Sequence, residues 1–154
     1  MCALIPLNPP LVDTVAVAKY IVRINEMRLL IVEDNGQMRE MIKFFLRDVA
    51  EEIAERCDGS EALAAYREFA PDWVVMDIGM GKLDGIEATR QIISAFPLAR
   101  IVMLTQYDDL ALRQAAHEAG AQGYFTKGNL LPLREMLERE DVETRRLSGR
   151  NSVD

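Results

Sequence analysis

The sequence has few of the residues that build disulfide, thiolate-metal or histidine-based centres. Its two cysteines, Cys2 and Cys57, show no metal or redox spacing, and His117 is its single histidine. We interpret both cysteines as free thiols and His117 as a partly exposed helix residue. Since no serine or cysteine is placed to use His117 as a base, the sequence does not favour nucleophilic catalysis of that kind.

Basic residues are also in the minority, 18 against 25 acidic ones, and the net charge of -7 argues against sequence-independent nucleic-acid binding. No apolar run is long enough for a membrane span. The apolar stretch 11–24 is interrupted by Asp13, Lys19 and Arg23, and no basic region precedes it, so a signal peptide is not indicated. The sequence therefore predicts a cytoplasmic protein without direct contacts to membrane or nucleic acid.

Two terminal segments flank the 154-residue chain's single predicted domain at 27–140. Residues 1–26 have two interpretations: an upstream extension that ends before Met27, or a segment that contains a short amphipathic helix. The apolar face of that helix would contain Leu11, Val15, Ala18 and Val22. Residues 141–154 are polar, and we expect a frayed tail.

Strand-like and helix-like segments alternate from Met27 onward. Ser60 is a candidate N-cap, Asp109 lies in the first turn of a predicted helix, and Gly120 is a candidate C-cap. Five βα units joined by right-handed crossovers predict an α/β fold, a flavodoxin-like (βα)5 three-layer sandwich with parallel sheet order 2-1-3-4-5. The expected strands are 28–33, 52–57, 73–77, 100–105 and 123–126, and the expected helices are 36–49, 61–69, 85–96, 108–119 and 130–140.

Four of the expected strands end on polar residues: the pair Glu33 and Asp34, then Asp77, Thr105 and Lys127. The carboxyl ends of parallel strands meet at one edge of the sheet, where such folds bind ligands. Carboxylate oxygens suit Mg²⁺, and the ammonium group of Lys127 suits a phosphoryl oxygen. We expect Asp77 to have the best-exposed carboxylate and to be able to attack phosphorus.

Each of these residues also has a simpler interpretation. Asp34 and Asp77 could be helix caps or turn residues, and Lys127 could be a solvated strand end. Taken singly these interpretations are reasonable. Taken together they require coincidence to place every one of the residues at the same sheet edge, so we favour a common site.

Several motifs resemble the receiver domains of two-component response regulators, members of the CheY-like superfamily. The motif sequences are most similar to those of NarL/LuxR-type receivers, which usually precede a helix-turn-helix domain. The resemblance covers about residues 28–140. The segments that carry it are 29–35, 75–80, 84–88, 103–109 and 119–127.

The resemblance implies a role for each site residue. Asp77 would be the phosphoacceptor, and Mg²⁺ would be held by Asp34, Asp77 and the backbone carbonyl of Gly79, with Glu33 acting largely through water. Lys127 would bind the phosphoryl group. Thr105 and Tyr124 would be the switch pair, and the output surface would lie on 110–119, 123–126 and 130–140. Tyr124 could also be a static aromatic at the sheet edge.

Three positions differ from the usual family pattern. Gly81 and Gly128 stand where proline is common, so we expect a more flexible loop after Asp77 and no cis-proline after Lys127. Gln106 stands where a small residue is usual, and its side chain could narrow access to the phosphoryl site. None of these changes removes a residue that the chemistry needs.

The expected function is therefore that of a non-enzymatic receiver, which takes a phosphoryl group from a sensor histidine kinase or phosphotransfer protein and signals to a downstream protein or a second copy. The alternatives are a fragment of a LuxR-type transcription factor and a binding-only receiver that is not phosphorylated. A Mg²⁺-dependent phosphohydrolase is a further rival. Such enzymes normally have a second acid two residues beyond the nucleophile, where this sequence has Gly79.

Overall fold

A computed structural model describes residues 27–150, so the predicted N-terminal helix at 11–24 lies outside the described part. Strands and helices alternate as expected. The strands are β1 (Arg28–Val32), β2 (Glu52–Arg56), β3 (Trp73–Met76), β4 (Ile101–Thr105) and β5 (Gly123–Thr126). The helices are α2 (Gly36–Leu46), the short 3₁₀ helix η1 (Gly59–Glu61), α3 (Ala62–Phe69), α4 (Gly85–Ala95), α5 (Leu110–Glu118) and α6 (Leu131–Arg150).

The five strands form one parallel sheet in the order β2-β1-β3-β4-β5, which confirms the predicted topology. Leu29 of β1 pairs with Ile53 of β2 on one side and with Trp73 of β3 on the other. β2 lies beyond β1 on one side of the sheet, and β4 and β5 lie beyond β3 on the other. The strands β1 and β3 therefore define the topological switch point, where ligand crevices form in such sheets.

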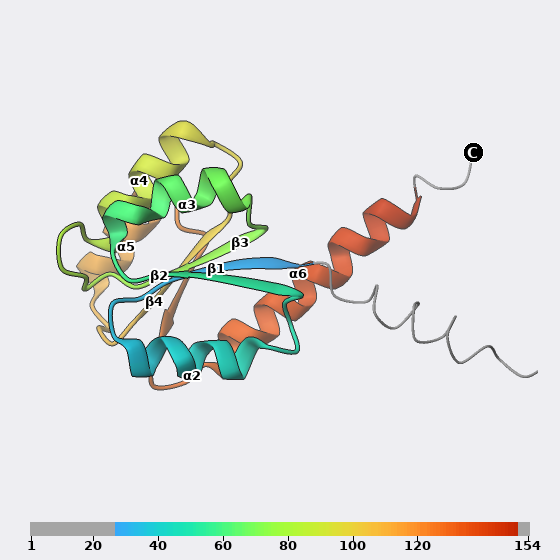
Figure 1. The fold of residues 1–154 in the computed structure, drawn as a ribbon, viewed down its shortest axis with the longest axis horizontal. Coiled ribbons are helices and arrows are strands. Elements are labelled where there is room, and N and C mark those ends of the chain that lie inside the picture. Colours follow the sequence, from blue (N-terminus) through green and yellow to red (C-terminus); the bar gives the residue numbers. More distant parts are fainter. Residues whose placement is uncertain (1–26, 151–154) are drawn as a thin grey trace, which may run out of the picture.

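Helices cover both faces of the sheet, with α2 and α6 on one side and α3, α4 and α5 on the other (Figure 1). Alternate residues of β1 enter the two resulting cores: Leu30 and Val32 join one, Leu29 and Ile31 the other. Because each strand face is buried, the central strands are continuously apolar rather than alternating. The long apolar runs in the sequence arise from this double burial.

Side-chain caps define where most helices begin. Asn35, Asp84 and Asp109 accept hydrogen bonds from backbone N–H groups in the first turns of α2, α4 and α5. Asp109 is thus the N-cap of α5 rather than a first-turn residue. Gly120 follows the last residues of α5 with a φ of 105°, as expected of a glycine that ends a helix.

The prediction that Ser60 caps the second helix was wrong. Asp58 is the cap residue at this point, and its side chain accepts the N–H of Ser60 at the start of η1. Ser60 lies inside the short 3₁₀ turn that leads into α3. Aspartate and serine side chains can both accept a backbone N–H at the start of a helix. The sequence alone therefore does not show whether Asp58 or Ser60 is the cap.

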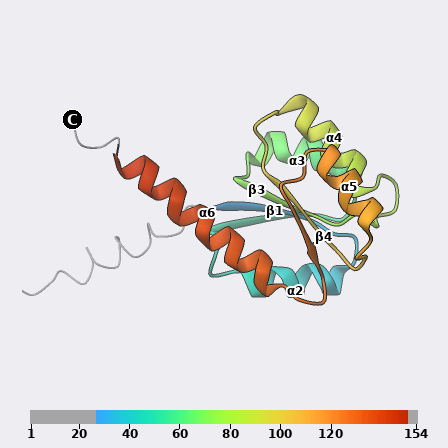
Figure 2. The same ribbon diagram turned by 180° about the vertical axis from the view of Figure 1, so that it is seen from behind.

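The C-terminal helix α6 continues to Arg150, so the expectation of a frayed segment from residue 141 was wrong over its first ten residues. Taken over its full length, α6 is polar but rich in glutamate and arginine, which favour helix. Ion pairs one turn apart, such as Arg134–Glu138 at 2.8 Å, add to that preference. Leu133 and Leu137 anchor the helix in the core, and beyond them it extends past the sheet (Figures 1 and 2).

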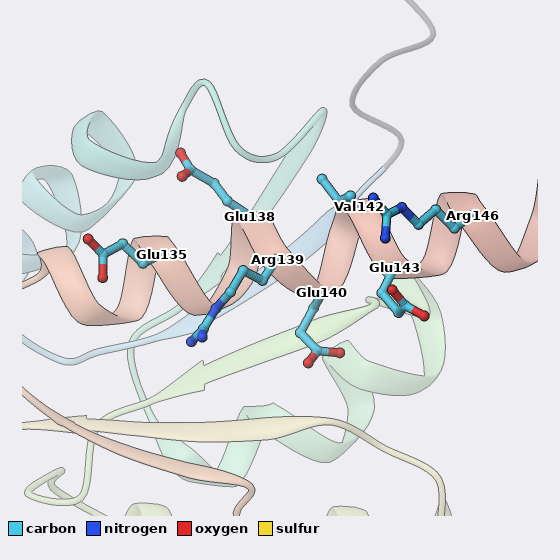
Figure 3. Close-up of a pocket in the computed structure, with 7 residues that line it drawn as sticks. All are labelled: Glu135, Glu138, Arg139, Glu140, Val142, Glu143 and Arg146. Atoms are coloured by element: carbon cyan, nitrogen blue, oxygen red, sulfur yellow. The ribbon is translucent and has the colours of Figure 1, made fainter.

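A pocket runs along α6 between Glu135 and Arg146, and its lining is charged except for Val142 (Figure 3). Glu140 in this lining lies 3.9 Å from the guanidinium of Arg100, just before the start of β4. The pocket therefore lies towards the N-terminal ends of the strands, away from the edge where their polar residues gather. No helix between residues 27 and 150 combines the length and apolarity needed to cross a membrane.

Gly85 offers a first test of the fold. A Cβ at this position would overlap the backbone carbonyl of Asp77, so only glycine allows α4 to start this close to the end of β3. We expect Gly85→Ala to lower the free energy of unfolding by about 3 kcal/mol, measured by urea denaturation. Gly128→Ala is the matched control, since nothing lies within 4 Å of its added Cβ. Equal effects of the two substitutions would contradict this account.

Candidate functional site

The sheet brings the polar strand ends together at one edge. Glu33 and Asp34 follow β1, Asp77 follows β3, Thr105 is the last residue of β4, and Lys127 follows β5. Backbone bonds fix these ends against one another: the N–H of Asp77 donates to Val32, and the N–H of Lys127 donates to Thr105, both at 2.9 Å. The site thus depends directly on strand order and register.

Three carboxylates form the centre of the site. Glu33, Asp34 and Asp77 each offer an oxygen atom, and these oxygens all lie within 4.8 Å of one another. Glu33 and Asp77 are buried and Asp34 is exposed, so the expectation that Asp77 has the best-exposed carboxylate was wrong. Asp77 lies deeper because its backbone is enclosed between β1 and Gly85, whereas Asp34 begins an open loop.

The ammonium group of Lys127 forms ion pairs with both buried acids. Its Nζ lies 2.7 Å from Oε2 of Glu33 and 2.9 Å from Oδ2 of Asp77, and its side chain is only 16% exposed. Lys127 is therefore not a solvated strand end. Burial by itself lowers the pKa of Lys127, but the hydrogen bonds to Glu33 and Asp77 and the negative charges of these acids together hold that pKa above its ordinary value.

The carboxyl group of Glu33 is held from two sides. Its Oε1 accepts the backbone N–H of Asn35 at 3.0 Å, while Oε2 faces Lys127. Burial raises the pKa of Glu33 above its ordinary value, although the hydrogen bond from Lys127 opposes this shift. A buried acid with a raised pKa beside a second acid is an environment in which an added cation would be stabilising.

Gly79 lies in the loop that follows Asp77, and its N–H donates a long hydrogen bond of 3.4 Å to Oδ1 of Asp77. A Cβ at residue 79 would lie 3.4 Å from the ring of Tyr107. The aromatic ring therefore lies over this glycine, and the two residues form one wall of the site. Gln106, which precedes the ring, is exposed.

Thr105 and Tyr124 both bind the backbone of Tyr107. The buried hydroxyl of Thr105 accepts the N–H of Tyr107 at 3.4 Å, and the hydroxyl of Tyr124 donates to the Tyr107 carbonyl at 2.8 Å. The guanidinium of Arg113 lies 4.6 Å from the centre of the Tyr124 ring. Partial burial raises the pKa of the Tyr124 hydroxyl further above neutral pH.

The motifs did not identify several residues that support the site. Arg39 donates to the backbone carbonyl of Glu33 at 2.8 Å and lies 3.5 Å from a carboxylate oxygen of Glu55. It thereby links the loop after β1 to β2. Asp58 binds the loop after Asp77. The contacts Arg39–Glu55 and Asp58–Lys82 each join segments that are distant in the sequence, so no local motif indicates them. The only available signal was the position of Arg39, one turn into α2.

The donor set suits a hard divalent cation. Glu33, Asp34 and Asp77 supply negatively charged oxygens, and the backbone carbonyl of the nearby Gly79 could supply a neutral one. Among residues 27–150, no sulfur or imidazole ligand joins this cluster, which disfavours soft metals. Bound there, the ion would neutralise charge on the carboxylates and on any phosphoryl group beside them.

Comparison with known proteins agrees with this geometry. Residues 29–139 match the family model of the response regulator receiver domain. The chain is 34% identical over 125 residues to an uncharacterized transcriptional regulatory protein, YhcZ of Bacillus subtilis, covering 80% of this chain and 55% of that protein. It is 39% identical over 100 residues to the chemotaxis protein CheY of Halobacterium salinarum, covering 65% of this chain and 83% of CheY.

A solved structure shows the same fold. A two-component response regulator of the LuxR family from an Aurantimonas species matches with a TM-score of 0.67 and 30% identity, over 80% of this chain and 99% of that one. The chain spans about half the length of the transcriptional regulators that it matches. Since the family model covers most of the chain, this protein belongs to the family of CheY-like response regulator receiver domains, which act in two-component signalling.

Proposed function

We propose that Asp77 is the phosphoacceptor of this receiver and takes its phosphoryl group from a phosphohistidine on a sensor kinase or phosphotransfer protein. The observation that carries the proposal is Lys127, whose ammonium bridges Asp77 and Glu33 within the carboxylate cluster. An oxygen of Asp77 attacks phosphorus, the phosphorus–nitrogen bond breaks, and its electron pair and a proton remain on the imidazole. The product is an aspartyl phosphate.

The other site residues stabilise the transferring group. Asp34, Asp77 and the Gly79 carbonyl would hold Mg²⁺ directly, and Glu33 would hold it through water, so that the ion supplies positive charge to the phosphoryl oxygens. Lys127 lies close enough to turn from Asp77 towards one of these oxygens. The hydroxyl of Thr105 can donate a hydrogen bond to another phosphoryl oxygen.

The same groups supply a route for the signal. If Thr105 turns towards a phosphoryl oxygen, it releases the N–H of Tyr107, whose carbonyl is held by Tyr124. Rearrangement of this pair would change the surface formed by α5, β5 and α6, on which a downstream protein or a second copy would bind. We further propose a cytoplasmic, non-enzymatic role without direct nucleic-acid contact by the described residues.

The direct test is incubation with acetyl phosphate or a phosphoramidate and Mg²⁺, followed by mass spectrometry. We expect the mass of one phosphoryl group on the intact protein and peptide mapping of the label to Asp77. Omission of Mg²⁺ should remove the label. An unlabelled protein, under conditions that label a control receiver, would favour a binding-only receiver, in which the exposed Gln106 is a candidate obstruction.

Beryllofluoride, a stable mimic of the phosphoryl group, tests the switch. We expect it to bind only with Mg²⁺ and to change the NMR environment of Tyr124, because the hydrogen bond to Tyr107 would be lost or shifted. Size measurements on the same sample would show whether a second copy binds. If the signals of Tyr124 do not change in the saturated complex, Tyr124 is a static aromatic and not part of the switch.

A further inference from the structure

The loop after Asp77 is fastened to a turn that lies far from it in the sequence. We infer that Asp58 is a positioning residue for the site. Together with Gly59, it holds the loop at 78–84 in the position that allows the backbone carbonyl of Gly79 to bind Mg²⁺. The inference rests on the proposed function, because it assumes that Mg²⁺ binds at the carboxylate cluster.

Asp58 makes the contact with both of its carboxylate oxygens. Oδ1 accepts the N–H of Ser60 at 2.8 Å within its own turn, and Oδ2 accepts the N–H of Lys82 at 3.1 Å across the gap to the loop. A hydrogen bond from the Ser60 side chain, followed by those from the backbone N–H groups of Ser60 and Lys82, holds the pKa of Asp58 below its ordinary value. One half-buried carboxylate thus joins η1 to the loop.

Gly59 gives independent support, because it shows how closely the two segments approach. This buried glycine lies directly against Leu83, and a Cβ at residue 59 would overlap the Leu83 carbonyl oxygen. The loop can therefore rest on η1 only if residue 59 has no side chain. The contacts at Lys82 and Leu83 are adjacent, so the turn fixes two consecutive loop residues.

The loop at 78–84 contains glycines that do not restrict its backbone, so contacts with Asp58 and Gly59 are needed to fix its position. Gly79 and Gly81 give its backbone wide conformational freedom. Its base is closed by the N–H of Gly85, which donates to the Ile78 carbonyl at 3.0 Å. With the base closed and the far end bound to Asp58, the segment that contains Gly79 is held at both ends. Within that segment, the N–H of Met80 donates to the Ile78 carbonyl at 3.0 Å, so a local hydrogen bond also spans Gly79.

Metal titration of three variants tests this role. Asp58→Ala removes both hydrogen bonds, and Asp58→Asn keeps one acceptor oxygen at nearly the same size. Asp72→Ala is the matched control: this aspartate also accepts a backbone N–H, from Arg28 at 2.7 Å, but at the start of β1, the opposite edge of the sheet. Affinity for Mg²⁺ alone is measured by calorimetry well below each variant's unfolding temperature, and exchange of the Lys82 amide hydrogen is followed in parallel.

We expect Asp58→Ala to bind Mg²⁺ about tenfold more weakly, as losses of groups that orient ligands commonly do. The Mg²⁺ affinity of Asp58→Asn should lie between those of Asp58→Ala and wild type. The amide hydrogen of Lys82 should exchange faster in both variants than in wild type. Asp72→Ala should bind Mg²⁺ within about twofold of wild type, even where it is less stable. Unchanged Mg²⁺ affinity in Asp58→Ala, or an equal loss in Asp72→Ala, would overturn the inference.

Phosphoryl uptake from acetyl phosphate separates this inference from the function on which it rests. If wild type binds Mg²⁺ and Asp58→Ala binds it weakly, but wild type takes up no phosphoryl group, Asp58 is a positioning residue and the proposed phosphotransfer is wrong. If wild type does not bind Mg²⁺ at all, both proposals fail. If wild type is labelled and Asp58→Ala binds Mg²⁺ normally, only the role of Asp58 is refuted.

Discussion

Asp77→Asn should abolish phosphoryl uptake completely while leaving the fold intact. An amide lacks the negatively charged oxygen that attacks phosphorus, so no acyl phosphate can form. The substitution keeps the size of the side chain, and Glu33 remains 2.7 Å from the ammonium of Lys127. Mass spectrometry after incubation with acetyl phosphate and Mg²⁺ measures the loss, and the thermal unfolding midpoint shows whether the domain is still folded.

Asp84→Asn is a suitable control for this experiment. Asp84 lies at the end of the same loop and caps α4 by accepting the N–H of Glu87 at 2.9 Å. Asparagine is also a good cap, so the control changes one carboxylate near the site without removing the nucleophile. It should be labelled like wild type. A label that persists in Asp77→Asn would assign phosphoryl uptake to another residue.

The phosphohydrolase alternative is tested with the same variants. A phosphohydrolase would turn over small phosphoesters, and the activity would disappear in Asp77→Ala. Such enzymes normally have a second acid two residues beyond the nucleophile, and this sequence has Gly79 at that position. We expect no turnover by wild type above that of Asp77→Ala.

Lys127→Met should lower the free energy of unfolding by about 3 kcal/mol in the absence of Mg²⁺, because it leaves two buried acids without a counter-charge. The Glu33 side chain is 1% exposed and that of Asp77 is 5% exposed, so water screens their repulsion poorly. Urea denaturation measures the loss. Added Mg²⁺ should stabilise this variant more than wild type, since it replaces the missing positive charge.

Lys43→Met is the matched control. Lys43 also contacts two acids, Glu40 at 3.0 Å and Glu55 at 3.1 Å, but those carboxylates are largely or partly exposed. Exposed pairs contribute little, so the loss of stability should be much smaller than that of Lys127→Met, and Mg²⁺ should not reverse it. If Lys43→Met and Lys127→Met lose equal stability with the same response to Mg²⁺, burial of the charge pair is not the cause.

The sequence predicted the sheet well because its signals are local. Buried parallel strands such as β1 and β3 are continuously apolar, and each is followed by a polar residue where the strand leaves the core. The resulting five βα units with short connections fitted the flavodoxin-like strand order 2-1-3-4-5 better than a closed eight-unit barrel. The order in turn placed Glu33, Asp34, Asp77 and Lys127 at one edge, where the structure has them.

Other features depended on contacts that no local pattern contains. The depth of Asp77 follows from Gly85 closing over its backbone, and the contact of Asp58 with Lys82 spans 24 positions. The cap at η1 was misassigned because Asp58 and Ser60 are both good caps. The length of α6 was underestimated because polarity was interpreted as fraying, whereas its glutamates and arginines favour helix.

The part of α6 beyond Glu140 extends past the sheet as a helical arm (Figure 1). Ten further helical residues reach about 15 Å from the point where the helix leaves the body of the domain. A tilt of about 10° at Glu140 would carry Arg150 through roughly 2.6 Å, given that rise per residue. A small change in the packing of Leu133 and Leu137 would therefore produce a displacement that grows with distance along this helical arm. A partner bound at the C-terminal end of α6 would experience the largest displacement.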